Sequence, residues 1–335
     1  MTPRRLGPFT VNPLGLGCMN LSHAYGTPPP AEAGEALLRR ALDLGVDCFD
    51  TATLYGAGAN ETLVGRVLEA HRDRITLCSK GGLAMERRAD GTLQRVIDGR
   101  PATLRRHVEA SLQRLDTDVI DLYYLHRFDK TVAVEDSVGE LARLVAEGKL
   151  RAIGLSEVSA PTLRRAHAVH PIAAVQNEYS LWTRNPEIAM LATCRELGTT
   201  FVAFSPLARA FLTDTLHDVS TLAEKDLRRG MPRFAPATYA ANLKLLPPYV
   251  ALAQEIGCTP AQLALAWVLA QGEQVVAIPG TSNIAHLEEN MGAGSVGLTA
   301  AQLQRVDALI NRHTVVGPRY SAASQADVDT EVFAD

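Results

Sequence analysis

The sequence lacks the features that mark membrane, secreted and metal-clustered proteins. Its longest apolar run, residues 263–270, is far shorter than the roughly 20 residues that cross a bilayer. Residues 1–5 contain no apolar leader segment. The 5 cysteines are an odd, scattered set without the paired spacing of a disulfide framework or a zinc site. We therefore expect a cytoplasmic protein without a membrane partner or a bound metal.

The charges of the two signs are nearly balanced. Lys and Arg number 33 and Asp and Glu number 37, which gives a net charge of −4, and no basic arm or patch stands out. This argues against a nucleic-acid partner. Hydrophobic residues make up 47% of the chain and charged residues 21%, an ordinary globular composition. No repeat or linker divides the chain, so we expect residues 1–335 to form one domain.

Short apolar runs rich in β-branched residues alternate with helical patterns along the chain. Residues 31–44 have helical periodicity, and Thr259 and Thr299 each begin a capping box. Such alternation predicts a parallel sheet, and eight units close most naturally into a (β/α)₈ TIM barrel. The expected strands are residues 11–18, 46–51, 75–80, 120–126, 152–156, 173–177, 200–205 and 275–279.

Two segments do not fit the regular alternation. Residues 209–242 form a long polar stretch after the seventh expected strand, which is typical of a lid or a binding loop. Its arginines Arg228, Arg229 and Arg233 could clasp a pyrophosphate or could form a solvated lid surface. The tail after Arg312 is irregular, and we expect it to cover one mouth of the barrel.

Three polar residues lie at the C-terminal ends of expected strands, where TIM barrels carry their active sites. They are Asp50, Lys80 and His126, and Tyr55 lies on the loop that follows Asp50. Because strand residues alternate between two faces, Lys80 points to the same face as residues 76 and 78. His126 likewise shares a face with residues 122 and 124. The sequence thus predicts an acid, a base and an imidazole at one rim.

These residue types suit proton transfer to a carbonyl oxygen. A free tyrosine has a pKa of about 10, and a neighbouring ammonium such as Lys80 lowers it by stabilising the phenolate. Asp50 could hold Lys80 in its charged form, and His126 could hold the substrate oxygen or relay a proton. Tyr55 would then be the acid that protonates the oxygen while hydride adds to the carbon.

Each of these residues could instead have a purely structural role. Asp50 and Lys80 could be only a buried ion pair, His126 a core histidine and Tyr55 a packing residue, although their joint occurrence favours catalysis. Lys80 could also be the Schiff-base nucleophile of a lyase. A third possibility is a redox-sensing subunit that binds the cofactor tightly and turns over slowly.

Seven motifs in order are similar to those of one enzyme family. They are GLGCM (15–19), FDTA (49–52) with Tyr55-Gly56, CSKG (78–81), DLYYLHR (121–127), GLSE (154–157), VQNEYSLW (175–182) and IPGT (278–281) leading to LEEN (287–290). The chain resembles the aldo-keto reductase superfamily over nearly its full length. Within it, the chain is most like the pyridoxal-reductase and plant auxin-induced branch.

The resemblance implies a reversible NAD(P)H-dependent reduction of an aldehyde or ketone, with Asp50, Tyr55, Lys80 and His126 as the catalytic tetrad. It also implies that Ser156 and Gln176 hold the nicotinamide carboxamide and that Phe204 stacks on the ring. Residues 205–207 with Arg209 would lie along the pyrophosphate, and residues 280–290 would take the adenosine. A helix capped by Ser282 or Asn283 supports that placement, because its free N–H groups favour a phosphate. The cofactor set implied is Gly17, Cys18, Met19, Asp50, Ser156, Gln176, Phe204, Ser205, Pro206, Leu207, Arg209, Gly280, Thr281, Ser282, Asn283, His286, Glu289 and Asn290. Tyr25, Phe128 and Trp182 are expected to border the substrate pocket.

The chain departs from its apparent relatives at two places. Ala208, Ala210 and Asp214 stand where relatives often have glycine, which would alter how the long loop hinges. Asn283 and His286 stand where NADPH-preferring relatives often have lysine and arginine, and a 2′-phosphate favours a strong cation. We therefore expect NADP(H) only narrowly over NAD(H). The sequence leaves open which small carbonyl compound is the substrate and whether the chain forms a homo-oligomer.

Overall fold

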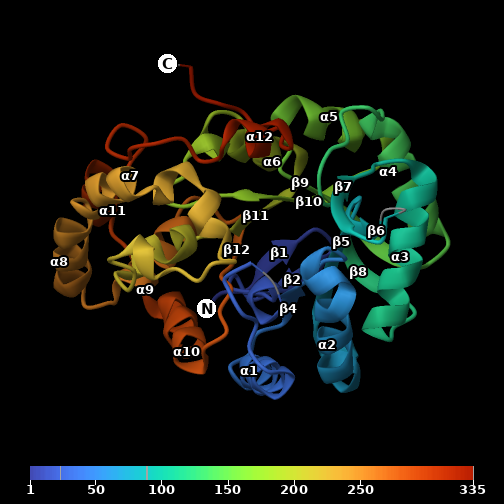
Figure 1. Cartoon of the computed structure of the whole chain (residues 1–335), viewed down its shortest axis with the longest axis horizontal. Helices are drawn as coiled ribbons and strands as arrows, with labels where there is room; N and C mark the ends of the chain where they lie inside the picture. Colours follow the sequence, from blue (N-terminus) through green and yellow to red (C-terminus); the bar gives the residue numbers. More distant parts are fainter. Residues whose placement is uncertain (23, 88–89, 335) are drawn as a thin grey trace.

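The computed structural model describes residues 1–22, 24–87 and 90–334, and within them eight parallel strands form a barrel (Figure 1). The sheet runs from the first barrel strand to the last, and it closes where the Gly15 N–H donates to the Ala277 carbonyl at 2.9 Å. The predicted (β/α)₈ TIM barrel is therefore confirmed. The barrel strands are β3 (Leu16–Gly17), β4 (Cys48–Asp50), β5 (Thr76–Gly81), β8 (Ile120–Leu125), β9 (Leu150–Ser156), β10 (Ile172–Glu178), β11 (Thr200–Phe204) and β12 (Val275–Ile278).

Helices surround this barrel, and their sequence signals are present in the structure. The first helix spans Ala31–Asp43, close to the expected bounds. Thr259 and Thr299 each accept a hydrogen bond from the backbone N–H three residues on, and each capping box is closed by its glutamine. The described helices are α1 (Ala31–Asp43), α2 (Ala59–Leu68), α3 (Pro101–Leu115), α4 (Val134–Ala146), α5 (Ala160–Val169), α6 (Met190–Leu197), α7 (Pro236–Leu243), α8 (Leu246–Ile256), α9 (Pro260–Leu269), α10 (Ile284–Gly292), α11 (Ala300–Leu309) and α12 (Ala322–Ala326).

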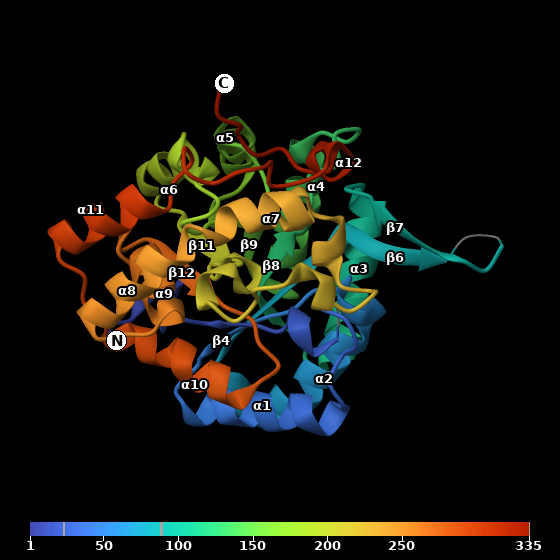
Figure 2. The ribbon, with the colours of Figure 1, turned by 60° about the vertical axis from the view of Figure 1, so that its left-hand side comes forward.

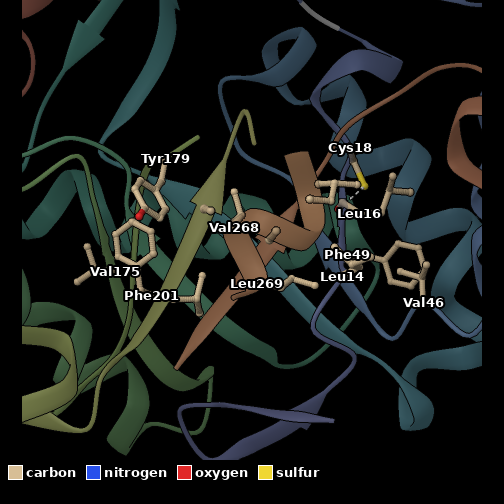
Figure 3. Close-up of a cluster of buried hydrophobic side chains, with 14 of the residues drawn as sticks. Leu14, Leu16, Cys18, Val46, Phe49, Val175, Tyr179, Phe201, Val268 and Leu269 are labelled. Atoms are coloured by element: carbon tan, nitrogen blue, oxygen red, sulfur yellow. Dashed lines mark hydrogen bonds between the residues drawn. The ribbon is translucent and has the colours of Figure 1, made fainter. Parts of the chain in front are cut away.

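Strand residues divide between two cores because the side-chain period is two. Inward residues such as Cys78, Leu122 and Val202 fill the barrel interior. Their immediate neighbours, such as Leu77 and Tyr123, face outward and pack in the layer between the strands and the helices. Figure 3 shows part of this outer layer, with Leu14, Leu16, Phe49, Val175 and Phe201 on strands or strand approaches and Val268 and Leu269 on α9.

A short antiparallel hairpin lies at the opposite end of the barrel from the active-site rim. It consists of β1 (Arg4–Leu6) and β2 (Phe9–Val11), whose residues Leu6 and Val11 belong to the interior core. The expected first strand, residues 11–18, is therefore wrong in its bounds. Val11 belongs to the hairpin, and the barrel strand is Leu16–Gly17 alone.

Glycine is required at two places where the barrel is crowded. A Cβ at Gly154 would lie 2.3 Å from the ring of Tyr124, which fills the barrel interior. A Cβ at Gly280 would lie 2.8 Å from the carbonyl oxygen of Gly17. Both substitutions would force the backbone or a buried ring to shift. The second glycine allows β3 and the segment after β12 to approach each other at the rim.

A second hairpin leaves the barrel after β5 and was not predicted. It consists of β6 (Leu83–Arg87) and β7 (Leu93–Ile97), and Figure 2 shows it projecting away from the barrel. Arg95 on β7 forms a salt bridge with Asp327, which follows α12 in the C-terminal tail. The tail and the hairpin therefore meet, although more than two hundred residues separate them in the sequence.

The long polar stretch 209–242 is folded over the rim and is not an irregular loop. It contains short 3₁₀ turns at Ala208–Thr213, Val219–Thr221, Leu227–Gly230 and Pro232–Phe234, and it continues into α7. The three residues that replace glycine near its start have positive φ angles. They are 51° at Ala208, 75° at Ala210 and 57° at Asp214. A left-handed conformation costs an L-residue roughly 1–2 kcal/mol, so this turn carries backbone strain.

Among the helices of the described part of the chain, none combines the length and the apolar character needed to span a bilayer.

We predict that Ala210→Gly raises the free energy of unfolding by about 0.5–1 kcal/mol. Relief of the left-handed strain, about 1–2 kcal/mol, exceeds the entropic cost of an added glycine, about 0.5–1 kcal/mol. Urea unfolding followed by circular dichroism measures the change. Ala251→Gly is the matched control, because it lies exposed within α8 and should lower stability by about 1 kcal/mol. Equal destabilisation by both variants would show that position 210 is not strained.

Candidate active site

A cavity of about 660 Å³ opens at the C-terminal ends of the barrel strands. Three of the four predicted catalytic residues, Asp50, Tyr55 and His126, line its wall. Lys80 is completely buried behind them. The cavity also extends to Ser282 and the start of α10. One end therefore lies at the predicted catalytic residues and the other at the predicted adenosine segment.

The strand alternation explains why polar residues collect here. Asp50 follows Cys48 by two positions and Lys80 follows Cys78 by two, and both cysteines face the barrel interior. Gln176 follows Ala174 in the same way on β10. Each of these three strands thus contributes an apolar side chain to the interior and a polar one at or near its C-terminal end.

The Lys80 ammonium is held on three sides. It forms a salt bridge with Asp50 and donates to the Thr51 carbonyl at 2.9 Å and to the Tyr55 hydroxyl at 3.1 Å. Burial by itself lowers the pKa of Lys80, but the Asp50 carboxylate raises it above its usual value. Lys80 is therefore charged at neutral pH and forms an ion pair with the Asp50 carboxylate.

The pKa of Tyr55 differs from the sequence-based expectation. Burial raises it above its usual value, and the lowering effect of Lys80 does not fully offset that rise. The expectation named the correct cation but omitted the cost of placing a phenolate in a buried site. Tyr55 therefore remains a phenol at neutral pH. Its ring meets that of His126 edge to face, with centroids 5.9 Å apart.

Asp50 is fixed from a second direction. Its Oδ2 accepts a hydrogen bond of 2.8 Å from Gln176 Nε2, while its other oxygen is paired with Lys80. Burial raises the pKa of Asp50, and Lys80 and Gln176 both oppose that rise. The resemblance to the aldo-keto reductases implies that Gln176 holds the carboxamide of the cofactor. In the structure Gln176 lines the cavity and also orients Asp50.

Most residues of the expected cofactor set lie on the cavity wall. The two that do not are Cys18 and Asn283. Cys18 is fully buried beneath the rim, and its N–H donates to the Asp50 carbonyl at 2.8 Å. The residues on the wall are Gly17, Met19, Asp50, Ser156, Gln176, Phe204, Ser205, Pro206, Leu207, Arg209, Gly280, Thr281, Ser282, His286, Glu289 and Asn290.

Asn283 is the N-cap of α10, one of the two alternatives that the sequence offered. Its Oδ1 accepts from the N–H groups of Ala285 at 2.8 Å and His286 at 3.4 Å. These helix donors are therefore already satisfied by the chain. The expectation that this terminus attracts a phosphate stays a prediction.

The three aromatic residues expected near the substrate have different positions. Tyr25 lines the cavity, and its hydroxyl accepts from Arg209 at 3.2 Å. Trp182 is buried and stacks on Phe211 with centroids 4.2 Å apart. Phe128 packs against the outer core. Neither Trp182 nor Phe128 is among the residues that line the cavity.

The loop arginines also divide into two groups. Arg228 lines the cavity, where it pairs with Asp226 at 2.7 Å. Arg229 donates to the Leu222 carbonyl, and Arg233 donates to the Gly317 carbonyl at 3.0 Å. Arg229 and Arg233 thus hold the loop and the tail together through backbone carbonyls. Neither a pyrophosphate clasp nor a solvated lid surface therefore describes all three arginines.

The tail is anchored over the cavity by a buried charge cluster. Arg319 forms salt bridges with Glu157 and with Glu178, the latter at 3.1 Å. Arg209 reaches the same Glu178 oxygen at 3.0 Å. Burial by itself would raise the pKa of Glu178, but these two guanidinium groups foremost lower it to about 2. The expectation that the tail covers the barrel mouth is confirmed by the cavity wall, to which Tyr320 belongs.

The sequence reasoning missed several residues of the wall. Arg127 belongs to the motif DLYYLHR (121–127) and directly follows His126. Its position just after the end of β8 could have indicated that it lies at the active-site rim. Others lie on the second hairpin and the tail, where no local pattern relates them to the tetrad. They include Leu83, Arg95, Tyr320, Ser324, Asp327 and Val328. Further ones such as Asn20, Leu54 and Met231 lie on loops at the rim.

Comparison with known proteins agrees with this geometry. The family model described as "Aldo/keto reductase family" matches residues 13–311. The curated "Probable aldo-keto reductase 1" of Glycine max is 44% identical over 321 residues, which cover 95% of this chain and 91% of that protein.

Two solved structures show the same fold over nearly the whole chain. The glycerol dehydrogenase AKR11B4 of Gluconobacter oxydans is 28% identical with a TM-score of 0.84, and the match covers 96% of this chain and 99% of that one. An aldo/keto reductase of Klebsiella pneumoniae, solved in complex with NADP and acetate, is 27% identical with a TM-score of 0.72 over 96% and 99% of the two chains. The family that the motifs indicated is confirmed, and this chain belongs to the aldo/keto reductases, enzymes of the oxidoreductase class.

Proposed function

We propose that the chain reduces an aldehyde or ketone reversibly, with hydride from a nicotinamide cofactor and a proton from Tyr55. The observation that carries the proposal is the hydrogen bond of 3.1 Å from the charged Lys80 to a buried Tyr55 hydroxyl on the cavity wall. A buried phenol beside an ammonium is suited to donate a proton to a neighbouring oxygen.

The raised pKa of Tyr55 is compatible with this role. The residue stays protonated at neutral pH, so it is ready to donate in the direction of reduction. An alkoxide is a far stronger base than a phenolate, so the transfer from Tyr55 remains favourable. Lys80 then stabilises the phenolate that is left, and Asp50 keeps Lys80 charged. His126 is positioned to orient the carbonyl oxygen.

The long cavity fits a dinucleotide, whose nicotinamide supplies hydride when it is bound. We propose that Ser156 and Gln176 hold the carboxamide and that Phe204 supports the ring. Residues 205–207 and Arg209 would bind the pyrophosphate, and the segment from Gly280 to Asn290 would bind the adenosine. The lining of one continuous cavity by these residues supports the assignment.

Two alternatives are less well supported. Lys80 is charged, buried and bonded to three acceptors, whereas a Schiff-base nucleophile needs a free amine. A redox-sensing subunit would bind the cofactor but turn over slowly. A screen of aldehydes, pyridoxal, sugars and ketones with NADPH and NADH in parallel separates these cases. We expect cofactor oxidation that depends on a carbonyl compound, without borohydride trapping of substrate on Lys80.

Replacing the proton donor gives the most direct mutational test. We predict that Tyr55→Phe lowers turnover by about 10²-fold or more, because it removes the general acid. Cofactor affinity, measured by fluorescence titration, should change little. Tyr249→Phe is the control, because it removes another buried hydroxyl hydrogen bond away from the cavity and should leave turnover intact. Full activity in Tyr55→Phe would refute the assigned acid.

Replacing the cation should move a pH profile in a defined direction. Alcohol oxidation needs Tyr55 as the phenolate, so its rate rises as the pH passes the pKa of Tyr55. Lys80→Met removes a charge that lowers this pKa. We therefore predict that the acid limb of the oxidation profile moves to higher pH, together with a slower reaction. A slower reaction with an unmoved limb would assign Lys80 to structure alone.

The adenosine end provides a test of cofactor choice. His286 and Ser282 line the cavity there, and residues 280–290 contain no lysine or arginine. We predict that His286→Arg tightens NADPH binding by about tenfold, equivalent to roughly 1.4 kcal/mol, and leaves NADH binding nearly unchanged. His286→Gln is the uncharged control. Equal effects on both cofactors would place the 2′-phosphate elsewhere.

A further inference from the structure

Among the described residues, four arginines line the cavity, and three of them have their charge matched by a carboxylate. Arg95 pairs with Asp327, Arg209 with Glu178 at 3.0 Å, and Arg228 with Asp226 at 2.7 Å. Arg127 is the exception, since no ion pair joins it to a carboxylate anywhere in residues 1–22, 24–87 and 90–334. It is half-buried, so an unmatched charge there is costly.

The hydrogen bonds of Arg127 hold one terminal nitrogen of its guanidinium and leave the edge formed by Nε and Nη2 without an acceptor among the described residues. Nη1 donates to the His126 carbonyl at 2.7 Å and to Ser156 Oγ at 3.4 Å. Nε is buried, and the described residues offer it no hydrogen-bond partner. Nη2 likewise has no acceptor among them. Nε and Nη2 form the planar fork that binds a carboxylate or phosphate through two parallel hydrogen bonds.

Arg127 is also next to the reacting groups. It directly follows His126 at the end of β8, and both line the cavity. Burial raises the pKa of Tyr55, and Arg127 is close enough for its charge to contribute a lowering effect. A ligand on the open edge would therefore lie near the carbonyl that Tyr55 protonates, at the opposite end of the cavity from His286.

We infer that the free edge of Arg127 is an anion subsite that selects carbonyl substrates with a carboxylate or phosphate close to the reacting carbonyl. The inference rests on the proposed carbonyl reduction, which it narrows to a substrate class. The bonds of Nη1 hold the guanidinium in place before the substrate arrives. A substrate oxyanion then satisfies the buried Nε–H and neutralises the remaining charge.

Matched substrate pairs test the inference in the unmodified chain. They are 4-oxobutanoate against its methyl ester, and glyceraldehyde 3-phosphate against glyceraldehyde. We expect kcat/KM to favour the charged member of at least one pair by about tenfold or more, and the pair that responds identifies the anion. The absence of a preference in both pairs would overturn the subsite.

Variants of Arg127 test the residue itself. Arg127→Met should reduce the charged-to-neutral ratio of kcat/KM by about 10- to 100-fold, the range expected for a lost charge-assisted pair of hydrogen bonds. Arg127→Lys keeps the charge without the planar fork, so its ratio should be intermediate, and it serves if the methionine variant does not fold. An unchanged ratio with lower rates for both substrates would mean that Arg127 only positions His126 and Ser156.

A binding measurement separates this inference from the proposed reaction. Succinate, which cannot be reduced at a carbonyl, is titrated calorimetrically into the chain with NADP⁺ added. We expect similar binding to the unmodified chain and to Tyr55→Phe, and at least tenfold weaker binding to Arg127→Met. Succinate binding that depends on Arg127 in a chain that reduces no carbonyl would refute the proposed function alone. Carbonyl reduction without such binding would refute the subsite alone.

Discussion

The ion pair between Lys80 and Asp50 is the interaction on which the site depends. A lysine inside a barrel tends to lose its proton, and removing one partner of a buried pair costs about 3–5 kcal/mol. Here the carboxylate keeps the ammonium charged, while Gln176 holds the other carboxylate oxygen. The same ammonium fixes the Tyr55 hydroxyl. Three strands and one loop are thus coupled through a buried cation that side chains and the Thr51 carbonyl hold together.

Arginines in the cavity wall and behind it have two kinds of surroundings. Arg319 and Arg209 are neutralised by Glu157 and Glu178, and these pairs join the tail and the long loop to the ends of β9 and β10. Their charges serve the architecture because both partners belong to the chain. Within the described residues, Arg127 has a backbone and a hydroxyl acceptor but no carboxylate, which is the basis of the proposed anion subsite. The proposed distinction between structural and ligand-binding arginines therefore rests on whether a carboxylate of the chain pairs with the guanidinium.

Much of the fold followed from local patterns. All eight barrel strands were expected, and so were the capping boxes at Thr259 and Thr299, because alternation and capping depend on residues that are close in sequence. The hairpin β6–β7 was missed because its register depends on packing and on a turn rather than on a strong apolar pattern. The first strand was misplaced because Val11 is a β-branched residue that suits a barrel strand but pairs with Arg4 in the β1–β2 hairpin. That pairing depends on tertiary structure and not on the local apolar pattern.

The sequence by itself determined the barrel, the reductase family and the identity of the four residues at the rim, because strand phase and motif order depend on local sequence. Tertiary structure decided what those residues experience. It made the pKa of Tyr55 higher than Lys80 alone would suggest, because burial penalises the phenolate. It also used Asn283 to satisfy helix N–H groups, and it brought Asp327 to Arg95 from the far end of the chain. Desolvation and long-range pairing exist only after folding, so no local pattern encodes them.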